Sequence, residues 1–158
     1  MIHFIDTSVL LNLLNVPLKN QNHDTVKEEY NKFVAQNDNF VFPAAVLFET
    51  GNHISHISDG SLRRTIASKF VRLINQAVDL QDNMSVIPEI TKNELNAILE
   101  NFPDQAMRGI GFGDSSIVAQ FEDYWENKQP IGEMRIWSLD AHLASHSHIG
   151  GLSRRKNR

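Results

Sequence analysis

The sequence predicts an α/β domain with a mostly parallel central sheet and helices on both of its faces. Three times, a short apolar run suited to a buried strand is followed at once by a helical pattern. The three runs are Ile2–Ile5, Phe40–Phe42 and Met134–Leu139. Because strands that alternate with helices pair in parallel, we expect their carboxyl ends to meet at one edge of the sheet.

The first strand-to-helix joint places an acid at this edge. Asp6, Thr7 and Ser8 separate the apolar run from a helix that starts near Val9. One explanation is a helix cap, because Asp, Ser and Thr are favoured there. The other is a ligand site, because ligands of open α/β folds bind beyond the carboxyl ends of the strands. The joint taken by itself leaves both explanations open.

The next part of the chain continues this alternation. Pro17 ends the first helix in a polar break, and residues 25–35 have the apolar spacing of a helix. Phe40–Phe42 is the second strand, and Pro43 is suited to the start of a helix over residues 44–57. On that helix Glu49 lies away from the apolar stripe.

The second half supplies further elements of both kinds. An amphipathic helix is predicted over residues 62–80, a strand over 84–87, and a helix over 91–100 that ends near Pro103. Further helices are expected over 114–127 and from Ala141 onward. The last strand is followed directly by Asp140, so an acid again stands between a strand and a helix.

A glycine-rich loop, Gly109–Gly113, stands before Asp114. It lacks the Lys and Ser/Thr of a phosphate-binding P-loop and does not fit the dinucleotide-binding fingerprint. We therefore expect it to bend the backbone and to place Asp114 at the start of a helix.

Composition bounds the protein class. The chain of 158 residues is 41% hydrophobic and 22% charged, as in a globular protein, and we expect one domain over residues 1–149 with a loose basic tail over 150–158. The absence of cysteine excludes disulfides and thiolate metal sites. No segment resembles a signal peptide or a membrane span, so we expect a soluble, cytoplasmic protein. The net charge of −4 argues against broad nonspecific phosphate binding.

Four acids share one topological position. Asp6, Glu49, Asp114 and Asp140 each lie at or just inside a helix that follows a strand or the glycine-rich loop. Singly, each has a plain structural explanation as a cap or a surface residue. Together, clustered carboxylates repel one another unless a cation neutralises them, and oxygen ligands suit Mg²⁺ or Mn²⁺. Such a site fits the logic of metal-dependent nucleases.

Four motifs in this order resemble those of PIN-domain ribonucleases, most closely the VapC-type toxins of toxin-antitoxin pairs. They are Phe4–Leu10, Glu49, Gly113–Ala119 and Trp137–Leu143. The resemblance implies a PIN-like three-layer α/β/α sandwich and a divalent-metal-dependent endoribonuclease in which a metal-activated water hydrolyses RNA. It also implies a homodimer and inhibition by a cognate antitoxin protein.

The resemblance assigns roles to individual residues. Asp6 and Asp114 are the principal metal ligands, and Asp140 and Glu49 complete the acidic pocket directly or through water. Three hydroxyl side chains are expected to orient the carboxylates. They are Thr7, Ser8 and Ser138.

The histidines are weaker candidates for functional residues than the four acids. His53 lies one helical turn beyond Glu49, where it can contact substrate, although a surface histidine is the plainer explanation. His142, His146 and His148 could together form a transition-metal site. Their short, exposed setting instead favours incidental surface histidines.

Other enzyme classes fit less well. No nucleophile elbow or Ser-His-Asp order is present, and no second Asp follows Asp6 at the spacing of a haloacid-dehalogenase-like phosphatase. Two functional alternatives stay open. One is a catalytically weak PIN-like module that binds RNA or protein, and the other is a metal-dependent DNA nuclease.

Overall fold

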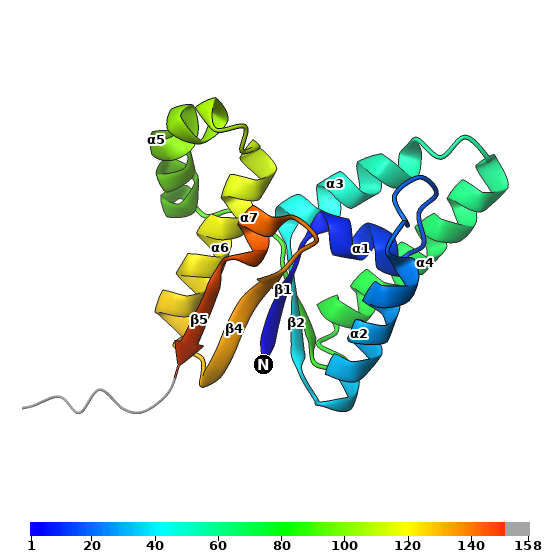
Figure 1. The fold of residues 1–158 in the computed structure, drawn as a ribbon, viewed down its shortest axis with the longest axis horizontal. Coiled ribbons are helices and arrows are strands. Elements are labelled where there is room, and N and C mark those ends of the chain that lie inside the picture. The colour runs from blue at the N-terminus through cyan, green and yellow to red at the C-terminus, as the bar shows by residue number, and fades with distance from the viewer. Residues whose placement is uncertain (151–158) are drawn as a thin grey trace, which may run out of the picture.

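The computed structural model describes residues 1–150, which form a five-stranded sheet covered by helices on both faces (Figure 1). The elements follow one another along the chain as β1 (Ile2–Ile5), α1 (Thr7–Leu13), α2 (His23–Ala35), β2 (Asn39–Pro43), α3 (Ala44–Ser55), α4 (Gly60–Val78), β3 (Met84–Ile87), α5 (Lys92–Met107), α6 (Phe112–Lys128), β4 (Gly132–Trp137), α7 (Ala141–Ala144) and β5 (Ser147–Gly150). The predicted mostly parallel α/β architecture is confirmed.

The strand order is β3-β2-β1-β4-β5, with β1 at the centre. All neighbouring pairs are parallel except β4 and β5, which are antiparallel. The carboxyl ends of β1, β2 and β4 therefore lie at the same edge of the sheet. Asp6 and Asp140 follow β1 and β4 at this edge, and α3 starts there after β2.

Alternate residues of β1 face the two helical layers. Phe4 is fully buried and packs edge-on against Phe121 of α6, with ring centroids 5.3 Å apart. His3 points to the opposite face, where its ring stacks on Phe33 of α2 at 4.2 Å. This period of two follows from the pleat of a strand. Figure 1 shows the same division, with α5 and α6 on one side and α2 and α4 on the other.

The helix caps agree with local sequence signals. Asp59 accepts a hydrogen bond from the Leu62 backbone at the start of α4. Thr91 and Glu94 form a reciprocal capping box at the start of α5. In α6 the cap is Gly111, so this helix begins two residues ahead of Asp114.

Two sequence expectations about the elements were wrong. The helix expected to end near Pro103 continues through this residue to Met107. Pro103 lies at an exposed position inside α5, which continues through it despite the lost backbone donor. The strand β5 was not expected at all. Its last residue, Gly150, pairs with Gly132, whereas the tail prediction for residues 151–158 falls outside the described residues.

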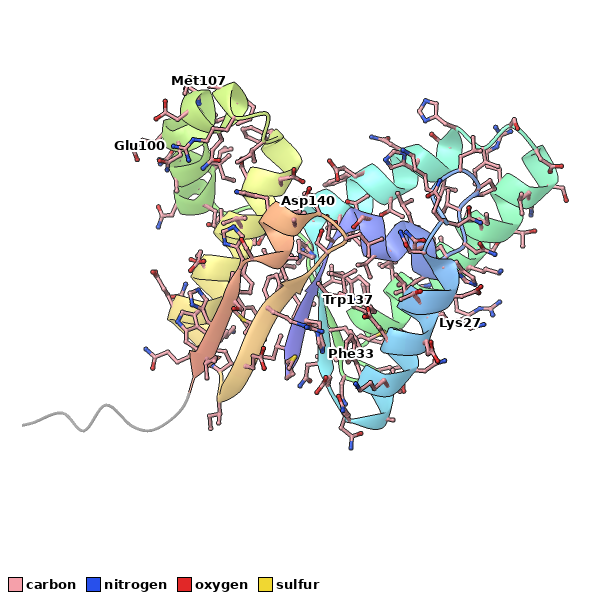
Figure 2. All side chains as sticks on the ribbon, viewed as in Figure 1. Lys27, Phe33, Glu100, Met107, Trp137 and Asp140 are labelled. Carbon is pink, nitrogen blue, oxygen red and sulfur yellow. The ribbon has the colours of Figure 1, made fainter. Side chains whose placement is uncertain are left out.

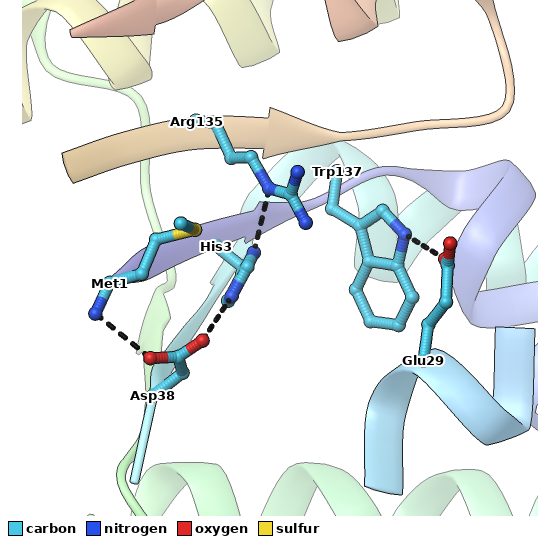
Figure 3. Close-up of polar contacts among 6 residues, drawn as sticks. All are labelled: Met1, His3, Glu29, Asp38, Arg135 and Trp137. Atoms are coloured by element: carbon cyan, nitrogen blue, oxygen red, sulfur yellow. Dashed lines mark hydrogen bonds and ion pairs between the residues drawn. The ribbon is translucent and has the colours of Figure 1, made fainter. Parts of the chain in front are cut away.

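A buried polar network ties the amino-terminal end of the sheet together (Figure 3). Asp38, just before β2, accepts hydrogen bonds from the Met1 ammonium and from His3 Nε2, both at 2.9 Å. Arg135 Nε of β4 donates to His3 Nδ1 at 3.1 Å. Close by, the indole of Trp137 donates to Glu29 of α2 at 3.2 Å. Within residues 1–150, no helix is long and apolar enough to cross a membrane.

Candidate active site

Asp6 is the N-cap of α1 and is only 5% exposed. Its Oδ2 accepts three hydrogen bonds, from Ser8 N at 3.2 Å, Ser8 Oγ at 2.5 Å and Ser138 Oγ at 2.7 Å. The cap and the site explanations are therefore compatible, because the cap uses one carboxylate oxygen. Among residues 1–150 no donor occupies Oδ1 of Asp6, which stays available for a ligand.

The two serines also fix the loop that follows β4. Ser138 Oγ accepts a hydrogen bond from the Asp140 backbone at 2.9 Å, and Ser8 Oγ accepts one from the Leu139 backbone at 3.1 Å. Asp140 itself caps α7, because its Oδ1 accepts hydrogen bonds from the backbone N–H groups of His142 at 2.9 Å and Leu143 at 3.1 Å. Ser8 and Ser138 thus connect the two strand-to-helix joints, each of which carries an acid.

Glu49 reaches the same region from α3. Its Oε2 accepts a hydrogen bond from Thr7 Oγ1 at 2.6 Å, so Thr7 holds this carboxylate against the start of α1. Gly113 of α6 lies against the other oxygen, since a Cβ added to it would stand 2.5 Å from Glu49 Oε1. Any larger residue at this position would displace Glu49. The role of Gly113 was not recognised from the sequence, although the glycine-rich loop pointed to it.

The carboxyl group of Asp114 is influenced by the charges of the other three acids. Burial raises the pKa of the Asp114 carboxyl above its ordinary value, and the charges of Asp6, Glu49 and Asp140 raise it further. A backbone hydrogen bond from Gly111 acts in the opposite direction. The structure therefore brings together the four acids that the sequence singled out. Figure 2 shows Asp140 at the start of α7, between the helices on the two sides of the sheet.

No Lys, Arg or His of the described residues forms an ion pair with these four acids. Their hard, like-charged oxygens fit a divalent cation such as Mg²⁺ or Mn²⁺, which binds through a few carboxylates and keeps several waters. Within residues 1–150, however, no three His, Asp or Glu side chains stand close enough to hold a metal ion as they are. The donor set fits the ion, and the side chains would have to move closer to bind it.

The histidines fall into two groups. His53 is half-buried on α3, one helical turn from Glu49, and its contact with substrate stays a prediction. His148 has a structural role that the sequence did not reveal: its ring stacks between Phe121 and Trp125, at 5.3 and 4.8 Å, and bonds Glu122 at 2.7 Å. This packing keeps β5 on α6.

A groove of about 410 Å³ opens between α5, α6 and α7, and none of the four acids is part of its lining. Ser115, which follows Asp114, and His142, which lies two residues after Asp140, are part of its wall.

Two solved structures share this arrangement of elements. VapC20 of Mycobacterium tuberculosis, a toxin that cleaves the sarcin-ricin loop, superposes with a TM-score of 0.59 over 90% of this chain and 95% of its own, at 18% identity. VapBC2 of Rickettsia felis, bound to a DNA fragment from its promoter, superposes with a TM-score of 0.51 over 75% of this chain and 79% of its own, at 15% identity. The chain has a VapC-like PIN fold. At such low identity the likeness concerns the fold, and comparison with family models and with curated proteins gives no match.

The VapC-like fold confirms the resemblance seen in the sequence motifs. It also explains the placement of the acids, because three strand-to-helix transitions of this fold meet at one sheet edge. Thr7, Ser8 and Ser138 each hydrogen-bond an acid of the cluster.

Proposed function

We propose that this protein is a divalent-metal-dependent endoribonuclease, the toxin of a type II toxin-antitoxin pair acting in the cytoplasm. One observation carries the proposal. Four carboxylates lie at or near the carboxyl edge of a VapC-like sheet, where burial and the charges of the other three raise the pKa of Asp114, and none of the four has an ion-pair partner among the described residues. Such a cluster costs free energy unless a cation compensates it.

In this proposal Asp6 and Asp114 hold Mg²⁺ or Mn²⁺, and Glu49 and Asp140 complete the pocket directly or through water. When bound, such an ion activates water and stabilises the charge that develops on a phosphodiester. The hydroxyls of Ser8 and Ser138 fix one oxygen of Asp6 and direct the other toward the site.

The solved relatives support the class of substrate and partner. VapC20 is a toxin that cleaves the sarcin-ricin loop, and VapBC2 was solved bound to a DNA fragment from its promoter. By analogy we propose an RNA substrate, a cognate antitoxin chain and a homodimer for this protein.

One observation favours a second candidate, a PIN-like binding module with a weak metal site. In residues 1–150 no three potential ligands are close enough to hold a metal ion. The two candidates differ in whether Mn²⁺ supports cleavage.

The test is cleavage of structured and unstructured RNAs with Mn²⁺ or EDTA, by the unmodified chain and by Asp6→Asn. The amide oxygen of Asn can still accept from Ser8 and Ser138, while its NH₂ group cannot bind a cation. We expect Asp6→Asn to keep the fold and to lose more than about 100-fold in rate, because partners that only orient metal ligands already contribute about 10–100-fold.

The matched control is Asp104→Asn, which removes an exposed carboxylate on α5, and should cleave normally. Cleavage that persists in EDTA or in Asp6→Asn would refute the metal-dependent mechanism. Cleavage of DNA and not of RNA would favour the DNA nuclease alternative.

A further inference from the structure

Gly113 is a glycine for which the backbone gives no reason. It is the second residue of α6, and its φ lies outside the positive range in which glycine is favoured. Within a helix, glycine is less favourable than alanine, because it loses more conformational freedom on folding. The reason for a glycine at this position must therefore lie in what surrounds its Cα.

The surroundings of Gly113 leave no room for a side chain. The three atoms nearest to an added Cβ all belong to Glu49, with Oε1 at 2.5 Å and Cδ at 3.1 Å. Gly51 of α3 is different, because a Cβ added there meets no atom within 4 Å. Both glycines stand in helices, but only Gly113 is required by a neighbour, and this neighbour is a carboxylate of the cluster.

The backbone of Gly113 is held more firmly than the carboxylate that lies against it. The Gly113 carbonyl accepts a hydrogen bond from Ser116 Oγ at 2.7 Å, and Ser116 is only 1% exposed. The next residue, Ile117, is fully buried and anchors this turn of α6 in the core. The Glu49 carboxylate is the end of a long, half-buried side chain. A Cβ at position 113 would therefore move the carboxylate and leave α6 in place.

Thr7 holds the same carboxylate through its other oxygen. Thr7 Oγ1, on the first residue of α1, donates to Glu49 Oε2 at 2.6 Å, and Thr7 is only 7% exposed. Glu49 thus has one oxygen bonded to α1 and the other against α6. Asp114 follows Gly113 directly, so this contact brings Glu49 to the part of α6 that carries another acid of the cluster.

We propose that Gly113 is a positioning residue of the active site, which lacks a side chain so that the Glu49 carboxylate is held between Thr7 and α6. Gly113 acts through Glu49 and not on the cation or the substrate itself. The inference rests on the proposed function, and it adds that the residue at position 113 sets the affinity for a divalent cation. Glycine here weakens the helix and fixes a ligand, a compromise between stability and activity that is common at functional sites.

The experiment compares Mn²⁺ affinity, from calorimetric titration, with the melting temperature of the metal-free protein. The first variant is Gly113→Ala. The second is Thr7→Val, which releases the other oxygen of Glu49 without adding a heavy atom. The matched control is Gly51→Ala, which makes the same change in α3 where the methyl group meets open space.

We expect Gly113→Ala to weaken Mn²⁺ binding about 10–100-fold, the usual effect of losing a group that orients a metal ligand. It should melt no lower than the parent, because alanine favours the helix and only a side-chain carboxylate has to move. Thr7→Val should weaken binding within the same range. Gly51→Ala should bind Mn²⁺ like the parent and melt about 1–4 °C higher.

A double-mutant cycle with Glu49→Ala tests whether the effect passes through the carboxylate. In this background no carboxylate is left for the methyl group to displace, so adding Gly113→Ala should leave the Mn²⁺ affinity unchanged. An equal loss of affinity with and without the Glu49 carboxylate would overturn the inference, because Gly113 would then act on its own.

Parental Mn²⁺ affinity in Gly113→Ala, or no Mn²⁺ binding by the unmodified chain, would also overturn it. So would a Gly113→Ala variant that melts well below the parent, because the methyl group would then disturb α6 and not Glu49 alone. The proposed function fails separately, if the unmodified chain binds Mn²⁺ but does not cleave RNA while the affinity still depends on residue 113.

Discussion

The two ends of the central sheet hold charged groups under opposite conditions. At the amino-terminal end, one carboxylate, Asp38, is matched by the Met1 ammonium and by His3, which in turn accepts from Arg135. At the carboxyl end, the charges of three carboxylates act on a fourth, Asp114, and no described cation forms an ion pair with any of the four. The same five-stranded scaffold thus carries one balanced network and one unbalanced cluster.

The pKa values express this contrast. Hydrogen bonds from His3 and the Met1 ammonium outweigh the effect of burial and hold the pKa of Asp38 below its ordinary value. Burial and three neighbouring carboxylates raise the pKa of Asp114. A balanced network stabilises the fold, whereas an unbalanced cluster costs stability until a ligand compensates its charge. Such imbalance is characteristic of functional sites.

The largest effect on stability is expected at the balanced end. Asp38→Ala would remove the shared acceptor of the Met1 ammonium and of His3, whose ring is fully buried. Because hydrogen bonds to charged groups contribute about 1.5–3 kcal/mol, we expect a loss of roughly 2–3 kcal/mol. Urea denaturation measures it. An unchanged midpoint would mean that the network adds nothing to the fold.

A smaller effect, on activity, is expected from a hydroxyl at the other end. Ser138→Ala should lower RNA cleavage about 10–100-fold, because residues that orient metal ligands contribute on that order. The fold should persist, and the control is Ser145→Ala, which changes the exposed C-cap residue of α7. Equal rates for Ser138→Ala and the parent would show that Asp6 does not depend on this hydrogen bond.

Asp114→Asn tests the cost of the unbalanced cluster. Removing one of four repelling charges should stabilise the metal-free protein by about 0.5–2 kcal/mol, the usual gain from relieving an unfavourable functional site. Added Mn²⁺ should raise the melting temperature of the parent and not that of the variant. A variant that is less stable than the parent would show that Asp114 is a structural residue.

The smallest effect concerns pH. Burial lowers the pKa of His3, with Arg135 contributing, although the hydrogen bond to Asp38 raises it. In the unfolded chain His3 titrates near 6.5, so below this pH the unfolded state binds more protons and stability falls. Stability should therefore decline as pH drops below 6.5 toward the lower folded value, with a slope of at most about 1.4 kcal/mol per pH unit.

Comparison with His3→Gln isolates this contribution, because the variant lacks the titrating group and should lose the slope. Asp114 acts in the opposite direction at lower pH. Its raised pKa means that the folded state gains protons first, so protonation between the raised value and 3.8 relieves the cluster. Identical pH profiles for His3→Gln and the parent would contradict the buried, neutral state of His3.

The sequence allowed the acids at the carboxyl end to be predicted, because strand-to-helix joints are local patterns. Asp6 and Asp140 each follow an apolar run directly, and parallel pairing brings such joints together. The network at the amino end could not be predicted. His3 is 35 residues from Asp38 and 132 from Arg135, and nothing in the local pattern connects them.

Two other features were beyond local patterns for similar reasons. β5 contains a single large apolar residue, Ile149, which is 82% exposed, so the strand is held by backbone pairing with β4 and by the stacking of His148. The closeness of Gly113 to Glu49 arises only when α6 packs against α3. Such contacts are set by tertiary packing, not by propensity.

The most direct test of the contrast between the two ends is calorimetric titration with Mn²⁺. We expect a saturable site in the unmodified protein, lost in Asp6→Asn and in Asp114→Asn, and retained in Asp104→Asn, which removes an exposed carboxylate outside the cluster. Binding that survives in both site variants, or that is absent from the unmodified protein, would contradict the claim that these carboxylates gather to hold a cation.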